Sequence, residues 1–236
     1  MDNQFWLGLL EIIGVNIVLS GDNAVVIAMA ARSLPVRQQR AAIVLGSGAA
    51  IVLRVILTTV AASVLSLPYL KLVGALLLLM IGVQLMLPAG EDDGSAGQAA
   101  VHLLAAVRTI LVADLVMSLD NVIAVAGAAH GNVVLLVAGL AISIPLIIFG
   151  SAAILKLMDR FPVIIKLGGA LLGYVAGEML LSEPVLQIYE QAPMVRALLP
   201  WGGALLVLVA GSWIAARTAA KARRAATFEQ DPPANT

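Results

Sequence analysis

The chain has 236 residues, of which 61% are hydrophobic and only 12% charged, and its formal net charge is zero. Soluble domains are about half apolar and about a quarter charged, so this composition excludes an ordinary soluble domain and indicates a membrane protein. The mean hydropathy of +1.02 agrees. The absence of Cys excludes disulfides and thiolate ligands, and the zero net charge gives no indication of a nucleic-acid partner.

Apolar runs recur along the chain, each near the length of about 20 residues that crosses a hydrocarbon core as an α-helix. The predicted spans, in chain order, are 4–31, 41–65, 69–88, 102–129, 132–155, 162–182 and 198–217. We therefore predict an all-α polytopic membrane protein with seven transmembrane helices. The first and fourth runs exceed a straight crossing, so we expect tilt or a break in them. The first run is also too long, and lacks the basic leader, for a cleaved signal peptide.

Basic residues indicate how the spans are oriented. They gather after the first span, after the fifth span and in the C-terminal tail, at Arg32, Arg37, Arg40, Lys156, Arg160, Lys166, Arg217, Lys221, Arg223 and Arg224. With seven spans these regions share one side of the membrane, which the positive-inside rule assigns to the cytoplasm. We expect the N-terminus outside and the C-terminus in the cytoplasm. The short loops and the Ala- and Leu-rich composition favour a bacterial inner membrane.

Two stretches of the sequence are duplicated. NIVLSGDNAVVIA (16–28) aligns with DLVMSLDNVIAVA (114–126), and KLVGALLLLMIGVQL (71–85) aligns with KLGGALLGYVAGEML (166–180). We predict a first three-helix repeat (1–88), an acidic, Gly-rich linker (89–100), a second repeat (101–182), and a seventh helix with a basic tail (183–236). Because three spans are an odd number, the second repeat is inverted, as in many secondary transporters. The alignment pairs Asn16 with Asp114, Ser20 with Ser118, Asp22 with Asp120, and Asn23 with Asn121.

The paired Asp-Asn motifs lie deep in their spans, where a carboxylate costs several kcal/mol unless it is paired or serves a function. Asp114 lies six residues before Asp120. On an unbroken helix the two side chains would be about 120° apart, so convergence needs an opened backbone. Gly21 favours such a break at 20–22 in the first repeat. Leu119 gives no such help at 118–120 in the second.

Together the two repeats supply carboxylate and amide oxygens, which suit a hard divalent cation such as Mn²⁺, Mg²⁺ or Ca²⁺. When empty, three close carboxylates would hold a proton, which cation binding would release. The alternative is that these residues join helices by hydrogen bonds. The predicted metal ligands are Asn16, Asp22, Asn23, Asp114, Asp120 and Asn121.

Other polar residues are accessory candidates. Arg54 needs a partner in mid-span, for which a site aspartate, Glu11 or Glu178 is available, and it either replaces the cation in the empty state or neutralises a buried charge. Glu11 and Glu178 are also candidates for lining a path. Core packing is the expected role of Met117, although its thioether would favour Mn²⁺ as a ligand. The hydroxyls of Ser20 and Ser118 complete the set.

The stretches GDNAVVIAMAARSLP (21–35) and SLDNVIAVAGAAHGN (118–132) resemble the TerC family of integral membrane proteins, in particular its short YjbE-like branch. The resemblance covers about residues 5–217. It implies export of manganese, with Asp22 and Asp120 as the motif aspartates. Asn16 replaces a carboxylate found in other members, which lowers the charge of the site by one.

These observations favour a secondary transporter that exports a divalent cation, with Mn²⁺ first, in exchange for protons. A Ca²⁺ or Mg²⁺ exchanger and an exporter of a small organic solute are the alternatives. The chain has no Walker motif. It also lacks the Gly-x-Gly-Asp pattern of an intramembrane aspartyl protease, so we expect that it is not an enzyme. The expected partners are the divalent ion, protons and the lipid bilayer, without a prosthetic group; a homodimer is compatible with the sequence.

Overall fold

The computed structural model describes residues 3–19, 21–64, 67, 69–87, 96–129, 132–186 and 192–230. The regular elements in these ranges are all helical. In chain order they are α1 (Asn3–Leu19), α2 (Gly21–Arg32), α3 (Val36–Val64), α4 (Leu70–Met86), α5 (Ala96–Ala129), α6 (Val133–Arg160), α7 (Val163–Leu181), the short 3₁₀ helix η1 (Pro184–Leu186) and α9 (Pro193–Gln230).

Most of these helices are long and apolar enough to cross a membrane. Five of the described helices, α3, α5, α6, α7 and α9, qualify alone. The α1–α2 pair qualifies together as a sixth, bent by 51° at the break between its two helices. The 17-residue α4 is a shorter apolar helix. The chain is thus an all-helical, multi-pass membrane protein, as its composition predicts.

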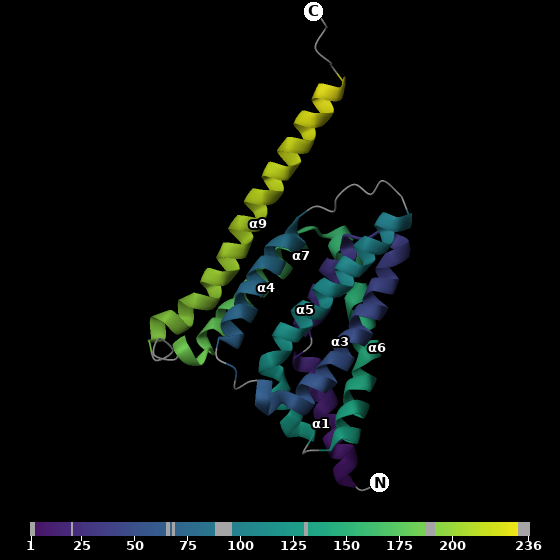
Figure 1. Cartoon of the computed structure of the whole chain (residues 1–236), viewed down its shortest axis with the longest axis vertical. Coiled ribbons are helices and arrows are strands. Elements are labelled where there is room, and N and C mark those ends of the chain that lie inside the picture. Colours follow the sequence, from purple (N-terminus) through teal and green to yellow (C-terminus); the bar gives the residue numbers. More distant parts are fainter. Residues whose placement is uncertain are drawn as a thin grey trace, which may run out of the picture.

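Contacts between the helices build one bundle with α9 along its side (Figure 1). α3 packs against α5, α6 packs against α1 and α2, and α4 packs against α7. Small residues allow close crossings, as predicted for small-residue surfaces in membranes. Gly46 faces Ile110, and Gly173 of α7 meets the backbone of Gly203 in α9. The buried apolar side chains form a core between these helices.

α9 is longer than a membrane span. Its 38 residues would extend about 57 Å at the α-helical rise of about 1.5 Å per residue. In Figure 1 it continues well past the rest of the bundle, and its end lies at the opposite end of the molecule from the start of α1. The C-terminal part of α9 therefore extends beyond the hydrocarbon core, which is about 30 Å thick.

The two motif regions differ in backbone structure. The first run is broken, since α1 ends at Leu19 and α2 begins at Gly21, where the sequence predicts an opening. α5, in contrast, continues without interruption through Ser118 and Leu119. The expected opening at 118–120 is therefore wrong. A leucine there offers none of the backbone freedom of Gly21, so the helical hydrogen bonds are kept.

The start of α4 is capped by a distant residue. Tyr69 precedes α4 with a left-handed backbone (φ 63°) and no capping bond from its own side chain. Instead, the carboxylate of Glu183, which is 1% exposed, accepts hydrogen bonds from the backbone N–H groups of Tyr69 and Leu72, each 3.1 Å long. Glu183 thus satisfies donors that a helix N-terminus leaves unpaired and ties α4 to the segment after α7.

Candidate cation site

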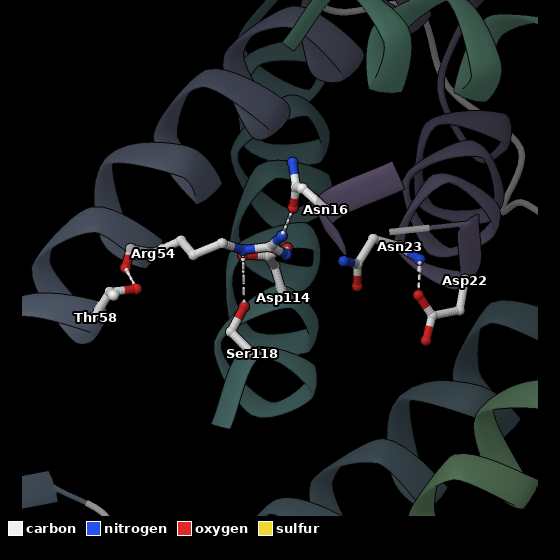
Figure 2. A network of polar contacts seen from close by, with 7 residues as sticks. All are labelled: Asn16, Asp22, Asn23, Arg54, Thr58, Asp114 and Ser118. Atoms are coloured by element: carbon white, nitrogen blue, oxygen red, sulfur yellow. Dashed lines mark hydrogen bonds and ion pairs between the residues drawn. The ribbon is translucent and has the colours of Figure 1, made fainter. Parts of the chain in front are cut away.

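Arg54 is the centre of a buried polar network between α1, α3 and α5 (Figure 2). Its Nη2 forms an ion pair with Oδ1 of Asp114 at 2.5 Å, and its Nη1 donates to Oδ1 of Asn16 at 2.8 Å. Its Nε donates to the hydroxyl of Ser118 at 3.1 Å. That hydroxyl in turn donates to the second carboxylate oxygen of Asp114 at 3.3 Å. The guanidinium thus has an acceptor on each of its three sides.

Helical spacing explains why these groups meet. Asp114 and Ser118 are four residues apart, so they lie one above the other on the face of α5 that contacts α3. On α3, the hydroxyl of Thr58 donates to the carbonyl oxygen of Arg54 at 2.7 Å, one turn away. Arg54 therefore extends its long side chain from α3 across to α5 and to Asn16 at the end of α1 (Figure 2).

Asp22 and Asn23 lie in the first turn of α2. One carboxylate oxygen of Asp22 accepts the backbone N–H of Asn23 at 2.8 Å, and the partial positive charge of the helix N-terminus stabilises that carboxylate. Asn23 is 3% exposed, and within the described residues neither its amide oxygen nor its amide nitrogen has a hydrogen-bond partner. Figure 2 shows this amide pointing towards the Arg54–Asp114 pair, while the carboxylate of Asp22 lies on the other side of Asn23.

The site is closed and holds a cationic side chain among its oxygens. Asn16, Arg54, Asp114 and Ser118 are all buried. Within the described part of the chain no three His, Asp or Glu side chains gather as a metal-binding group. The last turn of a helix leaves carbonyl groups without intrahelical donors, so the end of α1 is a potential source of further oxygens. Among the described residues, the carboxylate of Asp114 is the one that Arg54 contacts, and Arg54 balances its charge.

Several predicted site residues lie elsewhere or outside the described residues. Ser20 and the side chain of Asp120 are outside them. Asn121 is half-buried and has a partner of its own.

The suggested glutamate partners of Arg54 are wrong. Glu11 and Glu178 are both exposed, and the ion pair of Arg54 is with Asp114. The side chains that face the lipid and those that face the core alternate around a helix. Depth in a span therefore did not distinguish these acids from Asp114. Met117 is 5% exposed and belongs to the apolar core, as core packing predicts.

A cavity of about 300 Å³ lies at the other end of α2. It is lined by the C-terminal end of α2 with Arg32, by the end of α4 with Gln84, and by His102 and Thr109 of α5. Arg32 donates through Nη2 to the carbonyl oxygen of Leu87 at 3.3 Å, which joins the ends of α2 and α4. The buried stretch of α2 between this cavity and Asn23 closes the site on that side.

Sequence reasoning missed Thr58, Ser47 and Glu183 as buried polar residues. Thr58 follows Arg54 by one turn, which is the available signal for a hydroxyl on the same face of α3. Ser47 precedes Arg54 by seven residues, or about two turns, so it is also near that face. Glu183 precedes a proline directly after a helix, and that pattern alone does not distinguish a buried cap from an interfacial acid.

Comparison with known proteins identifies the family of the chain. The profile of the "Integral membrane protein TerC family" matches residues 1–219. The "Uncharacterized membrane protein YjbE" of Bacillus subtilis (strain 168) is 43% identical over 201 residues, which cover 85% of this chain and 91% of that protein.

The "UPF0053 inner membrane protein YoaE" of Escherichia coli (strain K12) is 26% identical over 185 residues, which cover 71% of this chain but 36% of that protein. No solved structure matches the chain. The family profile spans almost the whole chain, including both Asp-Asn motifs and Arg54. The chain therefore belongs to the TerC family of integral membrane proteins.

Proposed function

We propose that this protein is a secondary transporter that exports a divalent metal cation in exchange for protons, with Mn²⁺ as the first candidate ion. The observation that carries the proposal is a closed, oxygen-lined site deep in a helical membrane bundle, formed where a broken helix meets an unbroken one. Its ligands are Asn16 and the carbonyl end of α1, Asp22 and Asn23 at the start of α2, and Asp114 with Ser118 on α5. We also place Asp120 and Asn121 in this set by their motif.

The architecture of the proposal is two inverted three-helix repeats and a seventh helix, with α1–α2 as one span and α4 as a full span. Helix contacts support it. Exchanging α1–α2 with α5, α3 with α6, and α4 with α7 converts each main contact into another, since α3 packs on α5 just as α6 packs on α1 and α2. Arg54 also joins Asn16 and Asp114, which the sequence duplication pairs. Equivalent residues of the two halves thus meet at the centre, where inverted-repeat transporters bind their substrates.

The donor atoms support a hard divalent cation. Carboxylate, amide and carbonyl oxygens suit Mg²⁺, Ca²⁺ and Mn²⁺, and Cys is absent from the sequence. The choice of Mn²⁺ comes from membership of the TerC family. The cavity at the end of α2 fits an entry path from the cytoplasm. A bacterial inner membrane fits both the basic side of the chain and the name of the relative YoaE.

Ion flux through the purified protein in proteoliposomes tests the proposal. Uptake of Mn²⁺, Ca²⁺ and Mg²⁺ is compared with and without an imposed pH gradient, for wild type, Asp22→Asn and Asp114→Asn. We expect Mn²⁺ movement that dissipates the pH gradient, and loss of both signals in the two variants. Glu178→Gln removes an exposed carboxylate and serves as the matched control, with unchanged flux.

The ion panel separates the alternatives. Faster Ca²⁺ or Mg²⁺ flux with the same loss in the variants would assign one of these ions to the same site. No flux of any of the three ions through correctly folded protein would contradict the cation proposal. An organic solute with a carboxylate would need a positive group free to bind it, whereas Arg54 is already held by Asp114, Asn16 and Ser118.

A further inference from the structure

We infer that Arg54 is a tethered substitute for the transported cation, which occupies the ligand oxygens while the site is empty and must be displaced when a metal ion binds. This inference rests on the proposed function and adds a competitor to that same site. It gives Arg54 a role in setting affinity, beyond holding helices together.

The contacts of Arg54 coincide with the ligand set. Its three guanidinium nitrogens bind Oδ1 of Asp114, Oδ1 of Asn16 and the hydroxyl of Ser118, at distances of 2.5 to 3.1 Å. A cation coordinated by Asp114 and Asn16 would use these same oxygen lone pairs. The metal ion and the guanidinium therefore cannot both occupy the site, and binding is a competition between them.

Arginine is suited to this competition because its guanidinium stays protonated in proteins. A buried carboxylate without a counter-charge is strongly disfavoured, so Asp114 needs a cation in every state of the protein. Arg54 supplies that cation when no metal is present. Exchange of one cation for another then leaves Asp114 with a counter-charge in both states.

Arg54 and Asp114 belong to different halves, and among the described residues the equivalent helix contact has no such charged pair. The two helices α3 and α6 match in the repeats and begin at Val36 and Val133. Counting from these residues, Ser151 of α6 is at the position equivalent to Arg54 of α3. The position aligned with Asp114 is Asn16, which has no charge to balance. The contact between α3 and α5 thus has two charged residues, Arg54 and Asp114, whereas the equivalent contact between α6 and α1 has two neutral ones, Ser151 and Asn16.

The amide of Asn23 gives an independent indication that the site has a second occupant. It is 3% exposed, points towards the Arg54–Asp114 pair, and has no hydrogen-bond partner within the described residues (Figure 2). Buried polar groups are nearly always hydrogen-bonded, so one that is not needs an explanation. A metal ion in the place of the guanidinium would give the amide oxygen of Asn23 a partner.

Equilibrium binding of Mn²⁺ to the full-length protein in detergent tests the inference. Free Mn²⁺ is measured by electron paramagnetic resonance for wild type, Arg54→Ala and Arg54→Lys. We expect Arg54→Ala to bind Mn²⁺ at least about tenfold more tightly. The coupling energies of close charge pairs correspond to a factor of about ten or more in affinity. Arg54→Lys should lie between, since an ammonium keeps the charge but lacks the planar, pre-organised donors of the guanidinium.

A chemical rescue separates competition from a merely structural role. Ethylguanidinium added to Arg54→Ala should restore the competitor and weaken Mn²⁺ binding, whereas the same concentration of tetramethylammonium should not. Wild type should be insensitive to both. Arg108→Gln, which removes an exposed arginine six residues before Asp114 on α5, is the matched charge control and should bind Mn²⁺ as wild type does.

The outcomes separate this inference from the proposed function. If wild type binds Mn²⁺ and Asp114→Asn does not, while Arg54→Ala binds no more tightly, the competitor role fails and the cation site stands. If wild type and Arg54→Ala bind none of Mn²⁺, Ca²⁺ and Mg²⁺, both fail. If Arg54→Ala does not fold, Arg54→Lys decides, and binding equal to or weaker than wild type overturns the inference.

Discussion

At the scale of single residues, the ion pair between Arg54 and Asp114 dominates the interior of the bundle. Both side chains are buried, at 3% and 8% exposure, so water screens neither charge. Removing one partner of a buried pair leaves an uncompensated charge, whereas replacing both with apolar groups is often neutral. The pair is therefore costly to break but not a net source of stability.

Asp114→Leu tests this property. We expect it to lower the free energy of unfolding by about 3–5 kcal/mol, because Arg54 stays charged and buried without its partner. Arg54→Met with Asp114→Leu should recover most of that loss, since it leaves no charge behind. Thermal unfolding in detergent measures both, with Glu178→Gln as an exposed control. Equal loss in the single and double variants would contradict the account.

For Asn23 we expect the reverse effect on stability, because removing its amide should stabilise the protein while it removes a ligand. Asn23→Leu removes an amide with no partner among the described residues and keeps the branching of the side chain, so we expect stability to rise by about 1–2 kcal/mol. Binding of Mn²⁺, measured as its shift of the unfolding temperature, should be lost.

Ser47→Ala is the matched control for Asn23, because the buried hydroxyl of Ser47 also has no partner among the described residues. It should be at least as stable as wild type and keep the full Mn²⁺ shift. A destabilised Asn23→Leu that retains the Mn²⁺ shift would show that the amide is structural.

At the scale of helices, the crossing of α7 and α9 depends on glycine. A Cβ on Gly173 would overlap the carbonyl oxygen of Gly203, and Gly203 is equally close to Gly173. Tyr174 and Trp201 stack edge-to-face beside this contact, with ring centroids 5.2 Å apart. The two backbones touch here, so there is no flexible side chain that can move aside.

Gly173→Ala should therefore destabilise the protein by about 1–3 kcal/mol, as overpacking of a close contact does. Gly202→Ala is the control, because Gly202 is adjacent to Gly203 but has open space around it, and it should be tolerated. Thermal unfolding of both variants gives the comparison. Equal stability of the two variants would mean that α9 moves away from α7 at little cost.

Hydropathy predicted the helices well, because a membrane span needs a long apolar run wherever it lies. The predicted spans 132–155 and 162–182 differ from α6 and α7 by only a few residues at most ends. The sequence did not identify which acidic residue pairs with Arg54. It gives the depth of a residue in a span but not the side of the helix that faces the core. The same limit explains Glu11 and Glu178, whose side chains are exposed.

At the scale of the whole molecule, the proposed orientation depends on an odd number of crossings. The start of α1 and the end of α9 lie at opposite ends of the bundle (Figure 1). With α1–α2 and α4 each as one span, the turns at Ser33 and Phe161 are on one side, and those at Leu67 and Ser182 are on the other. By the positive-inside rule, we propose that the first pair faces the cytoplasm.

The absence of native Cys makes this orientation directly measurable. We expect Ser33→Cys and Phe161→Cys to react with a membrane-impermeant maleimide only in inverted vesicles. Leu67→Cys and Ser182→Cys should react in intact cells or right-side-out vesicles, because all four positions are exposed. Labelling of Ser33→Cys and Leu67→Cys from the same side would show that α3 does not cross the membrane.

The most direct measurement is a structure of the protein determined in saturating Mn²⁺, with anomalous scattering to identify the ion. We predict one Mn²⁺ between the halves, within coordination distance, about 2.0–2.6 Å for hard divalent cations, of oxygens of Asn16, Asn23 and Asp114, with the guanidinium of Arg54 withdrawn from Asp114. An intact Arg54–Asp114 pair with Mn²⁺ bound only elsewhere would contradict it.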